Sequence, residues 1–86
     1  MQVFLSKPAE KIYKKLPINI KKKADKQLIM LLSNPQHPSL KVKKLQGEKD
    51  YFEARIDYHY RLVFSKENSD IYIHSLGSHD VGLGRK

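Results

Sequence analysis

The sequence predicts an α+β fold in which two N-terminal helices pack on a small antiparallel sheet, in the order β-α-α-β-β-β. Three observations predict this class. Apolar residues recur at helical spacing in residues 9–16 and 20–32. Apolar and polar residues alternate, as they do in strands, in residues 51–65 and 71–76. The 86 residues suffice for one hydrophobic core, so we expect a single domain, residues 1–86.

The opening strand and the first helix meet at a serine. Residues 3–5 are a short apolar run that we interpret as a strand. Ser6 can cap the helix that follows, and Pro8 is tolerated in its first turn. One face of this helix carries Ala9, Ile12, Tyr13 and Leu16. Pro17 is expected to interrupt it.

The second helix is expected to begin near Asn19 and to stop by Asn34, because Pro35 disfavours helix in the residue before it. Its buried stripe is predicted to be Ile20, Ala24, Leu28, Leu31 and Leu32. The opposite side carries Lys21, Lys22, Lys23 and Lys26. Such a run is either a solvated helix face or a nucleic-acid contact, and we favour the solvated face.

The segment of residues 36–50 is interpreted as an extended connection. It contains Pro38, Gly47 and the lysines Lys41, Lys43, Lys44 and Lys49. We expect it to bring positive charge to the rim of the sheet; the alternative is an ordinary exposed loop.

Residues 51–65 predict a β-hairpin, and its register follows from its apolar faces. A slip of one residue would turn one apolar set into solvent. The register that keeps both sets together pairs Ile56 with Tyr60, Ala54 with Leu62 and Phe52 with Phe64. Arg55 then lies opposite Arg61 on the other face. Like charges directly across a strand pair are destabilising, so this placement suggests a bound anion between them.

Residues 71–76 predict the last strand, which follows a turn at residues 67–70. A four-residue turn would pair Lys66 with Ile71 and place Arg61 opposite Leu76. The segment Gly77-Ser78-His79 would then leave the sheet close to Arg61.

Composition restricts the partners and the location. Lys and Arg number 17 against nine Asp and Glu, giving a formal net charge of +8 and a pI near 9.8. This balance suggests a polyanionic partner such as nucleic acid, or an acidic protein. The chain has no cysteine, no secretory signal pattern and no long apolar span. We therefore expect a cytoplasmic protein that does not bind membranes.

The cationic residues suit phosphodiester chemistry. RNA carries an internal nucleophile, the 2′-hydroxyl group, so cleavage needs a base, an acid and cations around the phosphate but no metal. Arg61 is suited to bind phosphate oxygens. His79 is either the acid, which we favour, or a turn histidine that bonds to Asp80. His74 is a rival proton carrier or a structural histidine, and Glu53 forms a salt bridge or acts as a base. The histidines lack a metal-ligand spacing, so we expect no metal or other cofactor.

Two stretches resemble the RelE/ParE toxin superfamily of bacterial toxin–antitoxin systems. The first is Leu45-Gln46-Gly47 followed by Tyr51-Phe52-Glu53-Ala54-Arg55-Ile56 and Tyr60-Arg61-Leu62-Val63-Phe64. It is similar to the family's Leu-x-Gly, Trp/Tyr-x-x-Arg-Ile/Val and Tyr/His-Arg-Leu/Val-Val/Ile-Tyr pattern. The second, Leu76-Gly77-Ser78-His79-Asp80-Val81, is similar to the closing Gly-His-x-x-Asp-Val signature.

The resemblance implies a toxin of the RelE/YoeB-like mRNA interferase branch, neutralised by a cognate acidic antitoxin. Such members cut mRNA on the ribosome without a metal, and DNA binding is expected only for the toxin–antitoxin complex. The family's strand arginine falls on Arg61, and the general acid of the YoeB branch falls on His79. Lys43, Lys44 and Arg55 would hold RNA. The alternatives are a ParE-like inhibitor of DNA gyrase and a degenerate member that only binds RNA or its antitoxin.

Overall fold

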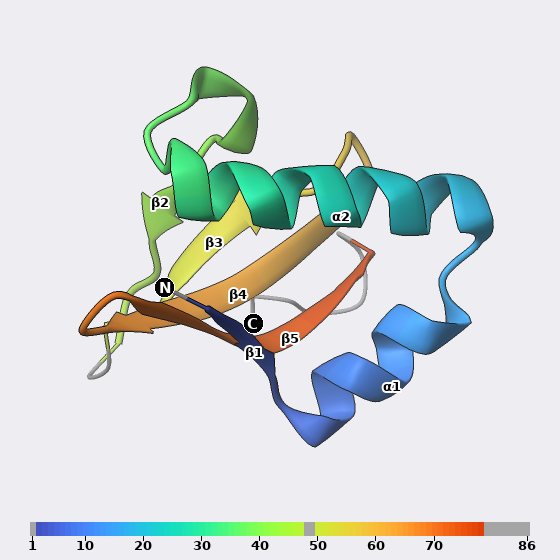
Figure 1. Ribbon diagram of the computed structural model, residues 1–86, viewed down its shortest axis with the longest axis horizontal. Helices are drawn as coiled ribbons and strands as arrows, with labels where there is room; N and C mark the ends of the chain where they lie inside the picture. The colour runs from blue at the N-terminus through green and yellow to red at the C-terminus, as the bar shows by residue number, and fades with distance from the viewer. Residues whose placement is uncertain (1, 48–49, 79–86) are drawn as a thin grey trace.

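A twisted five-stranded sheet and two helices make up the computed structural model, which describes residues 2–47 and 50–78. The predicted fold class is confirmed (Figure 1). The helices are α1 (Lys7–Lys15) and α2 (Ile18–Ser33), with a 3₁₀ turn η1 (Pro38–Leu40). The strands are β1 (Val3–Leu5), β2 (Lys43–Lys44), β3 (Phe52–Arg55), β4 (Tyr60–Glu67) and β5 (Asp70–Ser78).

The order of the strands is β1-β5-β4-β3-β2. All neighbours are antiparallel except β1 and β5, which pair in parallel, so the sheet is mixed. Parallel strands need a long crossover, and the chain between β1 and β5 contains both helices. The short strand β2 arises within the lysine-rich connection, which is therefore partly an edge strand of the sheet.

Ser6 links the first helix to the sheet. Its Oγ accepts a hydrogen bond from the Ala9 N–H, as predicted for an N-cap, and donates one to the His74 carbonyl at 2.8 Å. The Ser6 N–H donates to the Ile73 carbonyl. The helix α1 is therefore held against β5 at its N-cap, and this fixes where its apolar face lies.

The core lies between the helices and one face of the sheet. The helix α2 begins at Ile18, close to the predicted start, and its predicted stripe is buried at Ile20, Ala24 and Leu31. One buried α2 residue was not predicted. Gln27 is only 6% exposed, and its Nε2 donates to the Arg55 carbonyl at 2.9 Å and to the Ser39 carbonyl at 3.3 Å.

The predicted hairpin register is confirmed. Phe52 pairs with Phe64, Ala54 with Leu62, and Arg55 with Arg61. The two phenylalanine rings stack with their centroids 5.6 Å apart on the core side. The register follows from alternation alone, because any slip would have exposed these side chains.

The pairing of the last two strands was predicted correctly at the turn but wrongly beyond it. Lys66 pairs with Ile71 as predicted, whereas Arg61 pairs with Gly77 and not with Leu76. A β-bulge at Val63 and Phe64, whose partners are Ser75 and Ile73, adds His74 as an extra residue in β5. The spacing of the buried residues indicates it, because Ile73 and Leu76 are three apart and can face one core only across a bulge.

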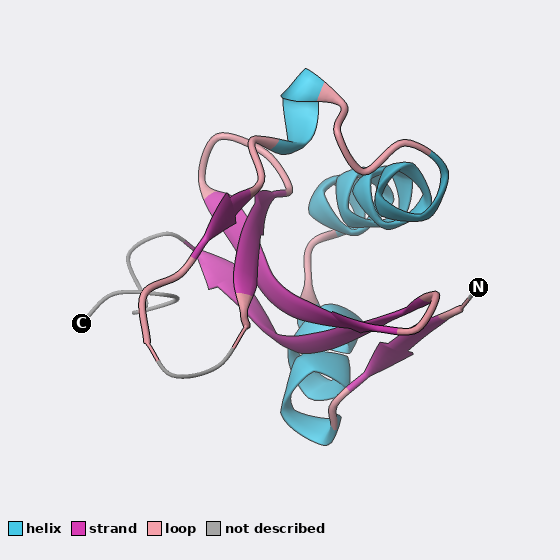
Figure 2. Cartoon of the chain, turned by 90° about the vertical axis from the view of Figure 1, so that its left-hand side faces the viewer, coloured by secondary structure: helices cyan, strands magenta, loops and turns pink. Residues whose placement is uncertain are grey.

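The view of Figure 2 shows the twist of the sheet and η1 in the connection from α2 to β2. Leu40 in η1 is fully buried and anchors that connection. No helix in the described part of the chain is long and apolar enough to cross a membrane.

Candidate functional site

Most of the candidate functional side chains lie on the face of the sheet that is turned away from the core. We call it the outer face. Alternation along the strands, together with the register, places on it Lys43, Glu53, Arg55, Arg61, Val63 and Ser65. Because β2, β3 and β4 are neighbours, one lysine, one glutamate and two arginines meet on three adjacent strands.

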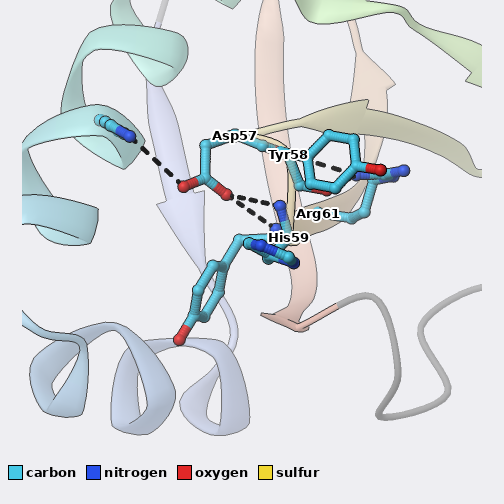
Figure 3. Close-up of polar contacts among 6 residues, drawn as sticks. Asp57, Tyr58, His59 and Arg61 are labelled. Carbon is cyan, nitrogen blue, oxygen red and sulfur yellow. Dashed lines mark hydrogen bonds and ion pairs between the residues drawn. The ribbon is translucent and has the colours of Figure 1, made fainter.

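Arg61 is anchored at the turn of the hairpin. Its Nη1 donates to the carbonyl oxygens of Asp57 and Tyr58, at 3.4 and 3.3 Å (Figure 3). Both bonds use the same nitrogen. The guanidinium group has five N–H donors, so the remaining donors stay available for a ligand. The half-buried Arg61 is therefore positioned by the protein without being saturated by it.

Arg55 has no neutralising partner among the residues that the structure describes. Its Nε is buried without a hydrogen bond, and it forms no ion pair with any residue in the ranges 2–47 and 50–78. Directly opposed residues on antiparallel strands lie about 4.5–5.5 Å apart at Cα, so two guanidinium groups share this part of the outer face. Such a pair is suited to bind an anion, because an anion would relieve the repulsion between the two charges.

Asp57 organises the turn that anchors Arg61. Its Oδ1 accepts hydrogen bonds from the N–H groups of His59 and Tyr60, each at 2.9 Å, and Lys23 Nζ on α2 lies 3.5 Å from its Oδ2. Burial raises the pKa of Asp57, but the two N–H bonds and the Lys23 charge outweigh it, so the pKa lies below its ordinary value. This role of Asp57 was not predicted, although an aspartate at the start of a turn is a known signal.

Glu53 was expected to form a salt bridge more readily than to act as a base. It is 8% exposed and lies between Lys43 and Val63 in the register. Within the part of the chain that the structure describes, it forms no ion pair. Arg61, one diagonal step away, is bonded to the turn instead. The carboxylate is thus present on the outer face beside both arginines.

His74 lies on the outer face, where a proton carrier that competes with His79 would have to lie. Its ring stacks on Tyr51, with centroids 4.2 Å apart, and its Nε2 is 2.7 Å from Ser65 Oγ. The bulge that shifts the pairing of Arg61 to Gly77 also brings His74 into contact with Tyr51 and Ser65. Its contacts suit a structural histidine, because stacking and the hydroxyl hold the ring in place.

The two predicted RNA-binding lysines diverge. Lys43 pairs with Glu53 and therefore belongs to the outer face, whereas Lys44 pairs with Phe52 and belongs to the opposite face. Lys44 Nζ lies 3.1 Å from Asp50 Oδ1, and both side chains are largely exposed. Of the two lysines, only Lys43 is placed beside the arginines.

His79 lies outside the described residues. The described chain reaches Ser78, which pairs with Tyr60, next to the pair of Arg61 and Gly77. No group of three or more His, Cys, Asp or Glu side chains within residues 2–47 and 50–78 could hold a metal ion.

Comparison with known proteins agrees with this architecture. The chain superposes on one chain of the heterotetrameric YoeB–YefM toxin–antitoxin complex from Staphylococcus aureus with a TM-score of 0.77 and 26% identity, and the match covers 90% of this chain and 94% of that one. A chain of the archaeal RelE–RelB complex from Pyrococcus horikoshii matches with a TM-score of 0.76 and 23% identity, over 94% of this chain and 97% of that one. A chain of the intact RelBE toxin–antitoxin complex from E. coli matches with a TM-score of 0.70 and 23% identity, over 91% of this chain and 95% of that one. No curated protein matches the chain.

The sequence profile of the ParE-like toxin domain matches residues 18–81, which is most of the chain and includes the whole hairpin. The resemblance to the RelE/ParE superfamily is therefore confirmed, with the RelE and YoeB toxins as its structural neighbours. The chain belongs to the ParE-like toxin domain family.

Proposed function

We propose that the protein is a ribosome-dependent, metal-independent mRNA endonuclease that inhibits translation as the toxin of a toxin–antitoxin system. The observation that carries this proposal is the facing pair of Arg55 and Arg61 on the outer face. Both arginines retain unused donors, and the planar guanidinium fork matches the geometry of phosphate oxygens.

In the proposed reaction, the 2′-hydroxyl oxygen attacks the adjacent phosphorus atom and the bond to the 5′-oxygen breaks. Arg61 stabilises the negative charge that develops on the phosphate oxygens. His79 donates a proton to the leaving 5′-oxygen. Its position in the chain supports this role, because Gly77, two residues earlier, is paired with Arg61.

We assign the proton acceptor to Glu53. The carboxylate lies on the same face as Arg61, one diagonal step away, and no described residue neutralises it by an ion pair. A carboxylate in this place can take the proton of the 2′-hydroxyl group while the arginines hold the phosphate. Arg55 and Lys43, on the same face, hold the RNA, with Lys44 at the rim.

The partners follow from charge and from the structural neighbours. A net charge of +8 favours an acidic antitoxin, whose binding would cover the cationic face. The neighbours from S. aureus and E. coli are toxin–antitoxin complexes. We propose that this protein acts in the cytoplasm on mRNA at the ribosome, and that it contacts DNA only as a toxin–antitoxin complex.

The test is to map mRNA ends on translating ribosomes supplied with the purified protein. Wild type is expected to produce cuts. Arg61→Ala should lower the rate about 10²–10³-fold, and His79→Ala and Glu53→Gln about 10²–10⁴-fold. Lys66→Ala is the matched control, because it removes an exposed charge from the same strand as Arg61 on its other face.

Circular dichroism of each variant must match wild type. If wild type makes no cuts but inhibits supercoiling by DNA gyrase, the ParE-like function replaces the endonuclease. The family match to a ParE-like toxin domain is the observation that favours this second candidate. If neither activity is found, the protein is a binding member of the family.

A further inference from the structure

A second cationic site lies between α2 and the hairpin. A pocket of about 280 Å³ is lined by Lys23, Lys26 and Gln27 from α2, by Ser39 from η1, and by Arg55 and Asp57 from the hairpin. We call it the helix–hairpin pocket. A solvated face was favoured over a nucleic-acid contact for the four lysines of α2, and two of them, Lys23 and Lys26, line this pocket.

The walls of the pocket are held together by one buried side chain. Gln27 Nε2 donates to the carbonyl oxygens of both Arg55 and Ser39, so α2, η1 and β3 meet at a single amide group. A buried amide bonded in this way fixes the three elements relative to each other. The pocket is therefore preformed by the fold.

The balance of charge in the pocket is positive. Lys23 and Lys26 carry two positive charges and Asp57 carries one negative charge, which leaves one; Arg55, whose side chain belongs to the outer face, adds its charge at the border of the pocket. The Asp57 carboxylate is already occupied, since one oxygen accepts two N–H bonds and the other faces Lys23. Lys26 forms no ion pair with any residue that the structure describes. Both N–H groups of the Gln27 amide are already donated to carbonyl oxygens, so the ammonium groups of Lys26 and Lys23 supply the donors that remain for a ligand. Phosphate oxygens accept charge-assisted hydrogen bonds from such groups.

We infer that the helix–hairpin pocket binds a phosphate of single-stranded RNA, next along the strand to the phosphate held by Arg61. This inference rests on the proposed function. Arg55 lines the pocket and is also paired with Arg61, so the two sites are contiguous. An RNA strand that crosses the outer face reaches the pocket at Arg55 and extends toward Lys26 on α2.

The test compares two lysines on the same helix. Lys26→Gln removes a charge from the pocket, and Lys22→Gln removes an exposed charge that does not line it. Binding of a short 2′-O-methyl RNA, which lacks the nucleophile and cannot be cut, is measured by fluorescence anisotropy across a range of salt concentrations. Lys26→Gln is expected to raise Kd about fivefold and to reduce the salt slope by about 0.7. Lys22→Gln should change Kd less than about twofold.

Two results would overturn the inference. Equal losses for Lys26→Gln and Lys22→Gln would mean that RNA senses only the diffuse charge of α2. Unchanged RNA binding by Lys26→Gln, with weaker binding of the acidic antitoxin, would assign the pocket to a carboxylate of that protein.

The failure of this inference is distinguishable from the failure of the proposed function. The uncuttable RNA reports binding without cleavage, whereas the mapping of mRNA ends reports cleavage. Selective weakening by Lys26→Gln without any cuts by wild type would retain the pocket and reject the endonuclease. Cuts by wild type together with equal effects of the two lysine variants would do the reverse.

Discussion

At the scale of a single residue, Arg55 occupies a position that costs stability. It faces a like charge across the strand pair, and its Nε is buried without an acceptor. A directly opposed like charge is destabilising by up to about 1 kcal/mol, and an unsatisfied buried donor by about 1–3 kcal/mol. A residue kept in such a position is explained if the ligand, absent from the folding equilibrium, supplies the missing acceptor.

Replacement of Arg55 by a neutral residue of similar length should therefore stabilise the fold. Arg55→Met is expected to raise the free energy of unfolding by roughly 1 kcal/mol, because it removes both the repulsion and the unpaired donor. The measurement is urea unfolding of both proteins without RNA. Lys43→Met on the same face is the control, with an expected change within about 0.5 kcal/mol. A marked loss of stability in Arg55→Met would show that Arg55 makes net favourable contacts and would remove the argument for a bound anion.

At the scale of an element, the β3–β4 turn positions Arg61 through its backbone. Asp57 accepts two N–H bonds within the turn, and the carbonyl oxygens of Asp57 and Tyr58 accept from Arg61. The Asp57 carboxylate thus holds the turn in one conformation, and the turn carbonyls in that conformation hold the guanidinium group of Arg61. Lys23 extends the same arrangement to α2.

The stabilising effect of Asp57 should depend on pH in a defined direction. Its pKa is lower in the folded protein than the ordinary value of 3.8, so the ionised form favours folding. This contribution is complete above that ordinary value and is lost as the pH falls through the lower folded pKa. Asp57→Asn should be less stable than wild type by about 1–2 kcal/mol at about pH 7. The difference should shrink toward about pH 3.

Urea unfolding across this range measures the difference. Asp50→Asn is the control, because the Asp50 side chain is 86% exposed and its bridge to Lys44 should contribute little. A difference between Asp57→Asn and wild type that stays constant down to acid pH would contradict the electrostatic role of Asp57.

Some elements could be predicted from the sequence and others could not, for physical reasons. The hairpin register is set by local alternation, and the N-cap of α1 by one serine. The bulge at His74 depends on which apolar residues of β5 must face the core, and the parallel place of β1 depends on pairing across the whole chain. The burial of Gln27 depends on contacts among α2, η1 and β3, and the helical periodicity of α2 holds no information about these contacts.

At the scale of the whole molecule, a small core must stabilise a chain with a high positive charge. The chain has 86 residues and a formal net charge of +8, so repulsion works against its compact state. Helices and sheet share one core in which Leu31, Leu40, Leu62 and Ile73 are the largest fully buried side chains. A domain of this kind is stable by only about 5–15 kcal/mol.

A truncation at the centre of the sheet should consume much of that margin. Leu62, on β4, is 1% exposed, and Leu62→Ala is expected to cost about 2–5 kcal/mol because a cavity remains. Ile29→Ala on α2, where the side chain is 65% exposed, should change stability by less than about 0.5 kcal/mol. Thermal and urea unfolding compare the two variants. Similar losses in both would indicate that the core is not centred on β4.

The sequence by itself determined the fold class, the hairpin register, the opposed arginines and the family resemblance, because each depends on alternation or motif spacing within a short segment. Only the tertiary structure decided the pairing of Arg61 with Gly77, the separation of Lys43 from Lys44, and the pocket shared by α2 and the hairpin. These features depend on how distant segments share one core, and that is settled by packing of the whole chain rather than by local pattern.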